Sequence, residues 1–155
     1  MAEIYLIDDD KLVNYLNREM IQSMAPQSQI LTFESAPKAL GSLRDKVDLG
    51  EFSFPQLIFL DINMPFMDGW EFLVQYAQFP ASFRLKTNIF LLSSSIDKHD
   101  LDRASANPYV FDYLIKPLND EQLEGIGLSV WFYTMLNILE TQSNKWFFIF
   151  ARLIK

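Results

Sequence analysis

The sequence predicts an α/β protein with a doubly wound, five-stranded parallel sheet and helices on both faces. Two patterns support this. Strand-like and helix-like segments alternate five times, and the strand-like segments are continuous apolar runs instead of alternating apolar and polar residues. Such strands are buried on both faces, and right-handed crossovers place helices on each side. With 155 residues, half of them hydrophobic, the chain can form one compact core.

The amino-terminal half contains three predicted strands and two predicted helices. The strands cover residues 4–7, 30–33 and 56–60, each dominated by apolar residues. Between them, apolar residues recur at helical spacing over 12–24 and 36–47. Pro26 closes the first helix, and Ser35 is a suitable N-cap for the second.

The carboxyl-terminal half continues the alternation. In order along the chain we expect a helix, a strand, a helix and a strand over residues 69–79, 89–92, 98–106 and 113–115. Pro80 and Pro108 follow the two helices, and Asn119 or Asp120 caps a long final helix. We therefore divide the chain into a main domain over 1–125 and a C-terminal helical extension over 126–155.

Composition excludes several classes of protein. The chain has 20 acidic residues against 13 Lys and Arg, which argues against nucleic-acid binding, because phosphate contacts need a basic surface. It has no cysteine, as fits a cytoplasmic protein, and its start lacks the features of a signal peptide. Polar residues interrupt the longest apolar stretch, 126–139, so we expect no membrane span.

Polar side chains stand where four of the predicted strands end. Asp8 and Asp9 follow the first strand, Asp61 the third, Ser93 the fourth and Lys116 the fifth. Ligands of such sheets bind at the carboxyl ends of the strands. Three carboxylates at close range need a cation, and oxygen ligands alone favour Mg²⁺. This pattern suits phosphoryl transfer to an aspartate, and Asp61 is the candidate acceptor.

These residues and their order resemble the receiver domains of two-component response regulators, over roughly residues 3 to 125. That family has an acidic pair after strand one, an acceptor Asp after strand three, Ser or Thr after strand four and Lys-Pro after strand five. Residues 61–69, D-I-N-M-P-F-M-D-G, are similar to its D-x-x-M-P-x-x-D-G signature. The resemblance implies a flavodoxin-like fold with strand order 2-1-3-4-5.

The resemblance also implies which residues act at the site. Asp61 is the phosphorylation site. The implied cofactor is Mg²⁺, with four ligands: the side chains of Asp9 and Asp61, the backbone carbonyl of Asn63 and, through water, Asp8.

Further residues are implied to contact the phosphoryl group or to shape loops. Ser93 and Lys116 contact the phosphoryl oxygens, and Tyr113 is a switch residue that follows Ser93 inward. The loops are shaped by Pro65, Gly69 and Pro117, and the bond between Lys116 and Pro117 is expected to be cis.

The implied function is that of a stand-alone signalling receiver. A histidine kinase or histidine phosphotransfer protein donates a phosphoryl group to Asp61, and a downstream protein partner reads the changed surface. No enzymatic activity is expected beyond its own phosphorylation and dephosphorylation.

Two other functions compete with this interpretation. A Mg²⁺-dependent phosphatase of the haloacid dehalogenase type also uses a strand-end Asp, but it needs a second acid two residues later, where this chain has Asn63. A pseudo-receiver that only docks partners is the other alternative, and the complete set of site residues argues against it.

The C-terminal extension departs from the family. Apolar residues continue through Trp131 to Leu139, and from Ser143 onward the chain has three basic residues and no acid. At helical spacing, residues 146–154 are apolar on both sides, and such surfaces mark interfaces. We expect a homodimer through these C-terminal helices. The alternatives are a helix folded back on its own domain and a helix on a membrane surface.

Overall fold

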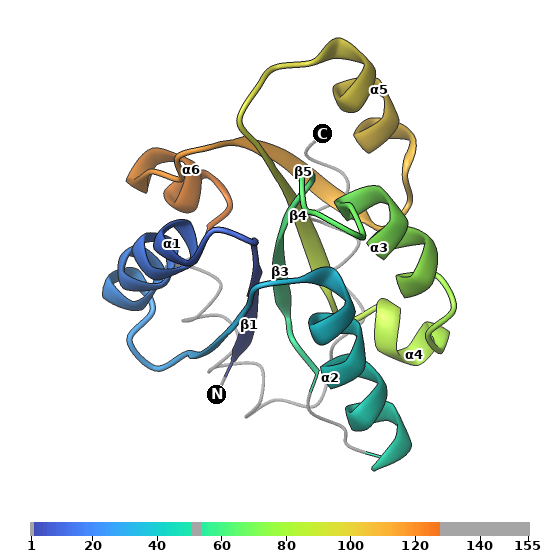
Figure 1. Cartoon of the computed structure of the whole chain (residues 1–155). Helices are drawn as coiled ribbons and strands as arrows, with labels where there is room; N and C mark the ends of the chain where they lie inside the picture. The colour runs from blue at the N-terminus through green and yellow to red at the C-terminus, as the bar shows by residue number, and fades with distance from the viewer. Residues whose placement is uncertain (1, 51–53, 128–155) are drawn as a thin grey trace.

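The computed structural model describes residues 2–50 and 54–127 (Figure 1). Five parallel strands form one sheet in the order β2-β1-β3-β4-β5. The strands are β1 (Glu3–Ile7), β2 (Gln29–Phe33), β3 (Leu57–Asp61), β4 (Asn88–Ser93) and β5 (Val110–Ile115). All five overlap the predicted strands, although β5 begins at Val110, three residues before its predicted start, and the strand order is the one that the family resemblance implied.

Six helices connect or follow the strands among the described residues. They are α1 (Lys11–Met24), α2 (Ala36–Asp48), α3 (Gly69–Tyr76), α4 (Ala81–Arg84), α5 (Lys98–Ala106) and α6 (Asp120–Gly125). Figure 1 shows α1 and α6 on one side of the sheet and α2, α3, α4 and α5 on the other. The predicted layering, with helices on both faces, is therefore confirmed.

Alternate residues of each strand enter two separate cores, which explains the continuous apolar runs. Tyr5 and Ile7 of β1 pack into the core beneath α2 and α3. Ile4 and Leu6 pack into the opposite core, which includes Ile21 of α1. Both faces of each central strand are thus removed from water, as expected for a parallel sheet.

The segment after α3 differs from the prediction. The helix predicted over 69–79 ends at Tyr76, and a further short helix, α4, follows Pro80. Aromatic packing stabilises this arrangement. The centroid of the Phe83 ring lies 5.2 Å from the centroid of the Phe79 ring and 6.4 Å from that of the Tyr76 ring. Phe83 is almost completely buried.

Where the sequence predicts a long final helix, the described part of the chain contains the short helix α6, which ends at Gly125 with Ile126 as its C-cap. α6 begins at Asp120 after the N-cap Asn119, which forms a capping box with Gln122. Residues 128–155, on which the expected dimer helices fall, lie outside the described residues. Over 2–50 and 54–127, none of the helices has the length and apolar character needed to span a membrane.

Candidate functional site

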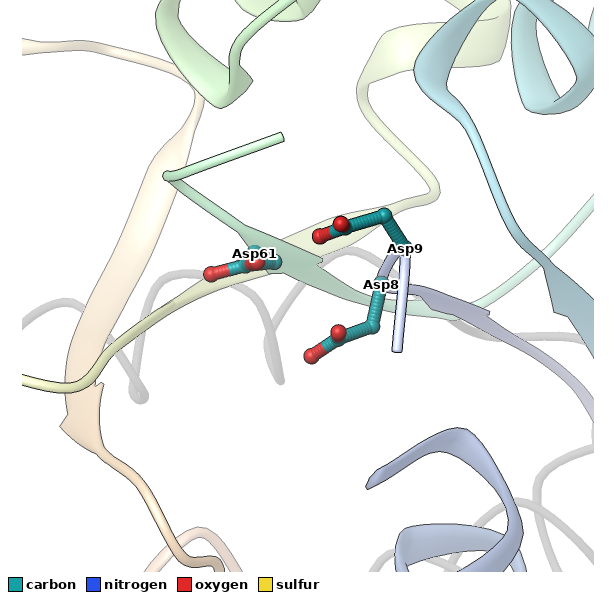
Figure 2. A group of neighbouring side chains, drawn as sticks. All are labelled: Asp8, Asp9 and Asp61. Atoms are coloured by element: carbon teal, nitrogen blue, oxygen red, sulfur yellow. The ribbon is translucent and has the colours of Figure 1, made fainter. Parts of the chain in front are cut away.

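Three carboxylates meet at the carboxyl ends of β1 and β3. Ile7 pairs with Leu60 in the sheet, so the next residues of the two strands, Asp8 and Asp61, emerge beside each other. Figure 2 shows these two side chains together with Asp9. Oxygen atoms of the three carboxylates lie within 4.8 Å of one another. The sequence prediction that these acids converge is therefore confirmed.

Lys116 enters this group from the end of β5. Its Nζ atom lies 2.5 Å from Oδ2 of Asp8 and 2.9 Å from Oδ1 of Asp61. Its backbone N–H donates a hydrogen bond to the carbonyl of Ser93, which fixes the start of the loop. The following bond to Pro117 is cis, as the resemblance implied. One ammonium group thus bridges two buried carboxylates.

Burial and ion pairing act in opposite directions on these groups. Burial raises the pKa of Asp61, and the hydrogen bond and charge of Lys116 offset only part of this rise. For Lys116, burial lowers the pKa, but its bonds to Asp8 and Asp61 outweigh burial and raise the pKa above its usual value. Further positive charge beside Asp61 would favour its ionised form.

Asp9 differs from its two neighbours because its carboxylate is exposed and lacks a hydrogen-bond or ion-pair partner in the part of the chain that the structure describes. By contrast, Asp8 is buried, its Oδ1 accepts a hydrogen bond from the Asp10 N–H, and its Oδ2 binds Lys116. The carboxylate of Asp9 is therefore free to bind an incoming cation, whereas that of Asp8 is already engaged.

The donor set fits a hard divalent cation. Three carboxylates and one ammonium leave a net charge of −2 when all are ionised. All the donors are oxygens, which Mg²⁺ prefers, and the exposure of Asp9 leaves room for the waters that Mg²⁺ retains. The backbone N–H of Asn63 donates to Oδ1 of Asp61 at 3.3 Å, which places the loop after β3 against the same carboxylate.

The loop from Asp61 to α3 is held close to the strand end. A Cβ atom on Gly69 would lie 2.7 Å from the carbonyl oxygen of Asp61, so this position has no space for a side chain. Asp68 caps α3 and forms a capping box with Glu71. Pro65 is exposed, and Phe66 is fully exposed with a φ of 68°, a conformation that the sequence did not reveal.

Ser93 and Tyr113 both contact the loop after β4. Ser93 is completely buried, and its Oγ accepts a hydrogen bond from the Ser95 N–H at 3.3 Å. The hydroxyl of Tyr113 donates to the carbonyl of Ser95 at 2.9 Å. Within the described residues no hydrogen bond joins Ser93 to Asp61. Ser93 and Tyr113 are therefore linked to each other through their hydrogen bonds to Ser95.

A groove of about 670 Å³ extends from the acids along α1. Asp8, Asp9, Asp61 and Lys116 line one part of it. The remainder is lined mainly by apolar residues of α1 and of the segment after β5: Val13, Leu16, Met20, Pro117 and Leu118.

Sequence reasoning missed two asparagines of α1. Asn14 is buried, and its amide donates to the carbonyl of Asp8 at 2.7 Å and to that of Phe33 at 3.2 Å. Asn14 thereby ties the loop that carries the acids to the end of β2. Asn17 is also buried and lines the groove. The two asparagines are three residues apart and so share one helix face. Hydrophobic periodicity did not reveal their burial, because it assigns buried positions only to apolar residues.

Comparison with known proteins identifies this arrangement. The sequence matches the response regulator receiver domain over residues 4–126. The chain belongs to the response regulator receiver family. A crystal structure of a two component response regulator from Cytophaga hutchinsonii is 32% identical, with a TM-score of 0.75 over 84% of this chain and 97% of that one. The acidic strand ends described above are thus those of a receiver domain.

Curated relatives include proteins of different lengths. "Probable methanogenesis regulatory protein FilR2" of Methanothrix harundinacea is 32% identical over 122 residues, which cover 78% of this chain and 76% of that protein. The cyclic di-GMP phosphodiesterase response regulator RpfG of Xanthomonas campestris is 25% identical over 120 residues, which cover 77% of this chain but only 29% of that protein. The similarity to these relatives is therefore a similarity of receiver domains.

Proposed function

We propose that this receiver accepts a phosphoryl group on Asp61 from a phosphohistidine of a histidine kinase or a histidine phosphotransfer protein. The observation that carries the proposal is the position of the Asp61 carboxylate at a strand end, 2.9 Å from Lys116 Nζ and among two further acids. In the reaction an Asp61 oxygen attacks phosphorus, the phosphorus–nitrogen bond breaks, and the imidazole leaves with the bonding electron pair.

The residues of the site have separate roles in this proposal. Asp9, Asp61 and the backbone carbonyl of Asn63 would hold Mg²⁺ directly, and Asp8 would hold it through water. When bound, Mg²⁺ neutralises charge on the phosphoryl oxygens and orients them for in-line attack. Lys116 stabilises one phosphoryl oxygen through its ammonium group.

Signalling follows from the charge that phosphorylation adds. A phosphoryl group brings a charge of about −2 to the strand ends, which draws the Ser93 hydroxyl toward it. Tyr113 shares the Ser95 loop with Ser93, so movement of this loop changes the surface around Tyr113. A downstream protein partner reads that surface. The chain catalyses only its own phosphorylation and dephosphorylation, and the absence of cysteine supports a cytoplasmic location.

Labelling with a small phosphodonor tests the proposal. Incubation with radiolabelled acetyl phosphate and Mg²⁺ is expected to give one acid-labile phosphoryl group per chain, and Asp61→Asn is expected to abolish it. Asp102→Asn, which alters an exposed acid on α5, is the matched control and should label normally. Acid-stable label on Ser93 would contradict the assignment. Multiple turnover of a small phosphate ester would instead indicate a phosphatase.

A further inference from the structure

Asp9 is the one acid of the site whose carboxylate no described residue holds in place. Asp8 and Asp61 each bind Lys116, and each accepts a hydrogen bond from a backbone N–H. Figure 2 shows the Asp9 side chain extending toward Asp61, and an oxygen of Asp9 lies within 4.8 Å of an oxygen of Asp61. The direction of the Asp9 carboxylate therefore depends on how the backbone at Asp9 is held.

Asn14 of α1 holds the backbone that leads into Asp9. Its side-chain amide donates a hydrogen bond of 2.7 Å to the carbonyl of Asp8, which belongs to the peptide bond between Asp8 and Asp9. Because a peptide bond is planar, fixing this carbonyl also fixes the direction in which the chain enters Asp9. The same amide donates to the carbonyl of Phe33 at 3.2 Å, which ties the peptide to the end of β2.

The burial of Asn14 indicates that these two hydrogen bonds are the reason for an amide at this position. Asn14 is 3% exposed. Its Oδ1 is buried and accepts no hydrogen bond from the described part of the chain. Such an acceptor costs stability, and an apolar residue of similar size avoids the cost. The amide therefore serves its two acceptors, the carbonyls of Asp8 and Phe33, and not the packing of α1.

We propose that Asn14 is a positioning residue for the metal site: by holding the peptide bond between Asp8 and Asp9, it directs the Asp9 carboxylate toward Mg²⁺. The inference rests on the proposed function, in which Asp9 is a direct ligand of the ion. Without the hydrogen bond to Asp8 the peptide can rotate, and the ordering of Asp9 then opposes binding. Asn14 thus sets the affinity for Mg²⁺ and takes no part in the attack on phosphorus once the ion is bound.

Replacement of Asn14 by leucine tests this role. Asn14→Leu keeps a side chain of similar size and removes both donors. In calorimetric titration we expect the Mg²⁺ dissociation constant to rise about 10–100-fold, as is typical when a residue that orients a metal ligand is lost. The Mg²⁺ concentration for half-maximal acetyl phosphate labelling should rise by the same factor, while the labelling rate at saturating Mg²⁺ is retained. An unchanged affinity for Mg²⁺ would overturn the proposal, whatever the saturated rate.

Thr87→Val is the matched control for the loss of a buried donor. Thr87 is 7% exposed, and its hydroxyl donates to the carbonyl of Pro55 at 2.7 Å, the distance also found between the Asn14 amide and the Asp8 carbonyl. Thr87 precedes β4 and so lies at the edge of the sheet opposite to the acids. Thr87→Val should lower the thermal stability and leave the Mg²⁺ affinity unchanged. Equal weakening of Mg²⁺ binding in the two variants would reveal an effect of stability alone and would overturn the proposal.

Hydrogen exchange in the unaltered chain tests the same coupling without any substitution. If the hydrogen bonds of Asn14 favour Mg²⁺ binding, bound Mg²⁺ must favour those bonds by the same factor. Exchange of the Asn14 side-chain amide protons, followed by NMR, should therefore slow by up to about 10–100-fold in saturating Mg²⁺. The side-chain amide of Gln56, before β3, donates to the carbonyl of Phe54 at 2.7 Å and should exchange at the same rate in both buffers. Equal rates for Asn14 with and without the ion, or equal slowing of both amides, would overturn the proposal.

The Mg²⁺ titration of the unaltered chain separates the positioning role from the proposed function. If the unaltered chain binds Mg²⁺ and Asn14→Leu binds it equally well, only the role of Asn14 is overturned. If the unaltered chain binds no Mg²⁺, the proposed function is contradicted and the inference falls with it. If Asn14→Leu does not fold, the exchange rates in the unaltered chain decide whether Asn14 and Mg²⁺ are coupled.

Discussion

Lys116 Nζ bridges Asp8 and Asp61, at 2.5 Å and 2.9 Å from one oxygen of each carboxylate. The bridge supplies positive charge where Mg²⁺ is proposed to bind. Lys116→Met removes it and leaves two buried carboxylates close together, so we expect the free energy of unfolding to fall by about 3 kcal/mol in EDTA. With saturating Mg²⁺ the loss should be smaller, because the ion replaces the lost charge. Urea unfolding in the two buffers measures both values.

A second buried lysine provides the control for this experiment. Lys46 Nζ lies 3.0 Å from Oε2 of Glu3 at the opposite end of β1, and its side chain is 15% exposed against 14% for Lys116. Lys46→Met should destabilise the protein equally in EDTA and in Mg²⁺. If Lys116→Met also loses the same stability in both buffers, the ammonium group and the metal do not share one site.

The two acids after β1 should differ in their effect on metal binding. Asp9 is exposed without a described partner, whereas both oxygens of Asp8 are engaged by Asp10 and Lys116. Loss of a residue that only supports the metal ligands typically raises the dissociation constant roughly 10–100-fold. We expect Asp8→Ala to raise the Mg²⁺ dissociation constant within that range, and Asp9→Ala to raise it by more. Calorimetric titration of both variants decides the order, and a larger effect of Asp8→Ala would reverse the assigned roles.

The strand-end residues could be predicted because the carboxyl ends of all strands in a parallel sheet lie at the same edge. Each apolar run ends at a polar residue, and the pairing of Ile7 with Leu60 then brings Asp8 beside Asp61. The pattern of apolar runs placed these residues at one edge of the sheet, whereas the adjacency of β1 and β3 came from the strand order that the family resemblance implied. The same reasoning located Ser93 and Lys116 at neighbouring strand ends.

The remaining features depend on contacts that sequence periodicity does not encode. Asn14 is buried because two carbonyls, from Asp8 and Phe33, accept hydrogen bonds from its amide. Helix α4 follows α3 because Phe83 fits among aromatic rings already assembled by the fold. The positive φ of Phe66 is likewise set by the loop, since residues of this type rarely adopt it.

Gly69 should be required for the shape of the loop after Asp61. Gly69→Ala places a Cβ atom 2.7 Å from the Asp61 carbonyl oxygen and 3.0 Å from Ile62 Cα, both of them backbone atoms. The strand end or the loop must shift, so we expect a loss of about 1–3 kcal/mol in stability and slower labelling of Asp61. Gly41→Ala, in the interior of α2 with nothing within 4 Å, should instead gain up to about 1 kcal/mol. Equal effects of the two substitutions would contradict this account.

Tyr76 makes stability sensitive to alkaline pH. Its side chain is 1% exposed, and burial raises its pKa to about 12, from an ordinary value of 10.0. Folding therefore favours the protonated phenol. This contribution to stability is complete below pH 10 and is lost as the pH rises from 10 to about 12, because the unfolded chain ionises first.

Tyr76→Phe should remove this sensitivity, since phenylalanine keeps the ring and has no proton to lose. Between pH 9 and pH 12, the free energy of unfolding of the unaltered chain should fall relative to Tyr76→Phe by about 2–3 kcal/mol, which is the two-unit rise in pKa expressed as energy. Denaturant unfolding at several pH values measures this difference. Tyr15→Phe removes an exposed hydroxyl on α1 and should follow the unaltered chain throughout. Parallel curves for Tyr76→Phe and the unaltered chain would contradict this prediction. They would show that the Tyr76 phenol has the same pKa in the folded and the unfolded chain.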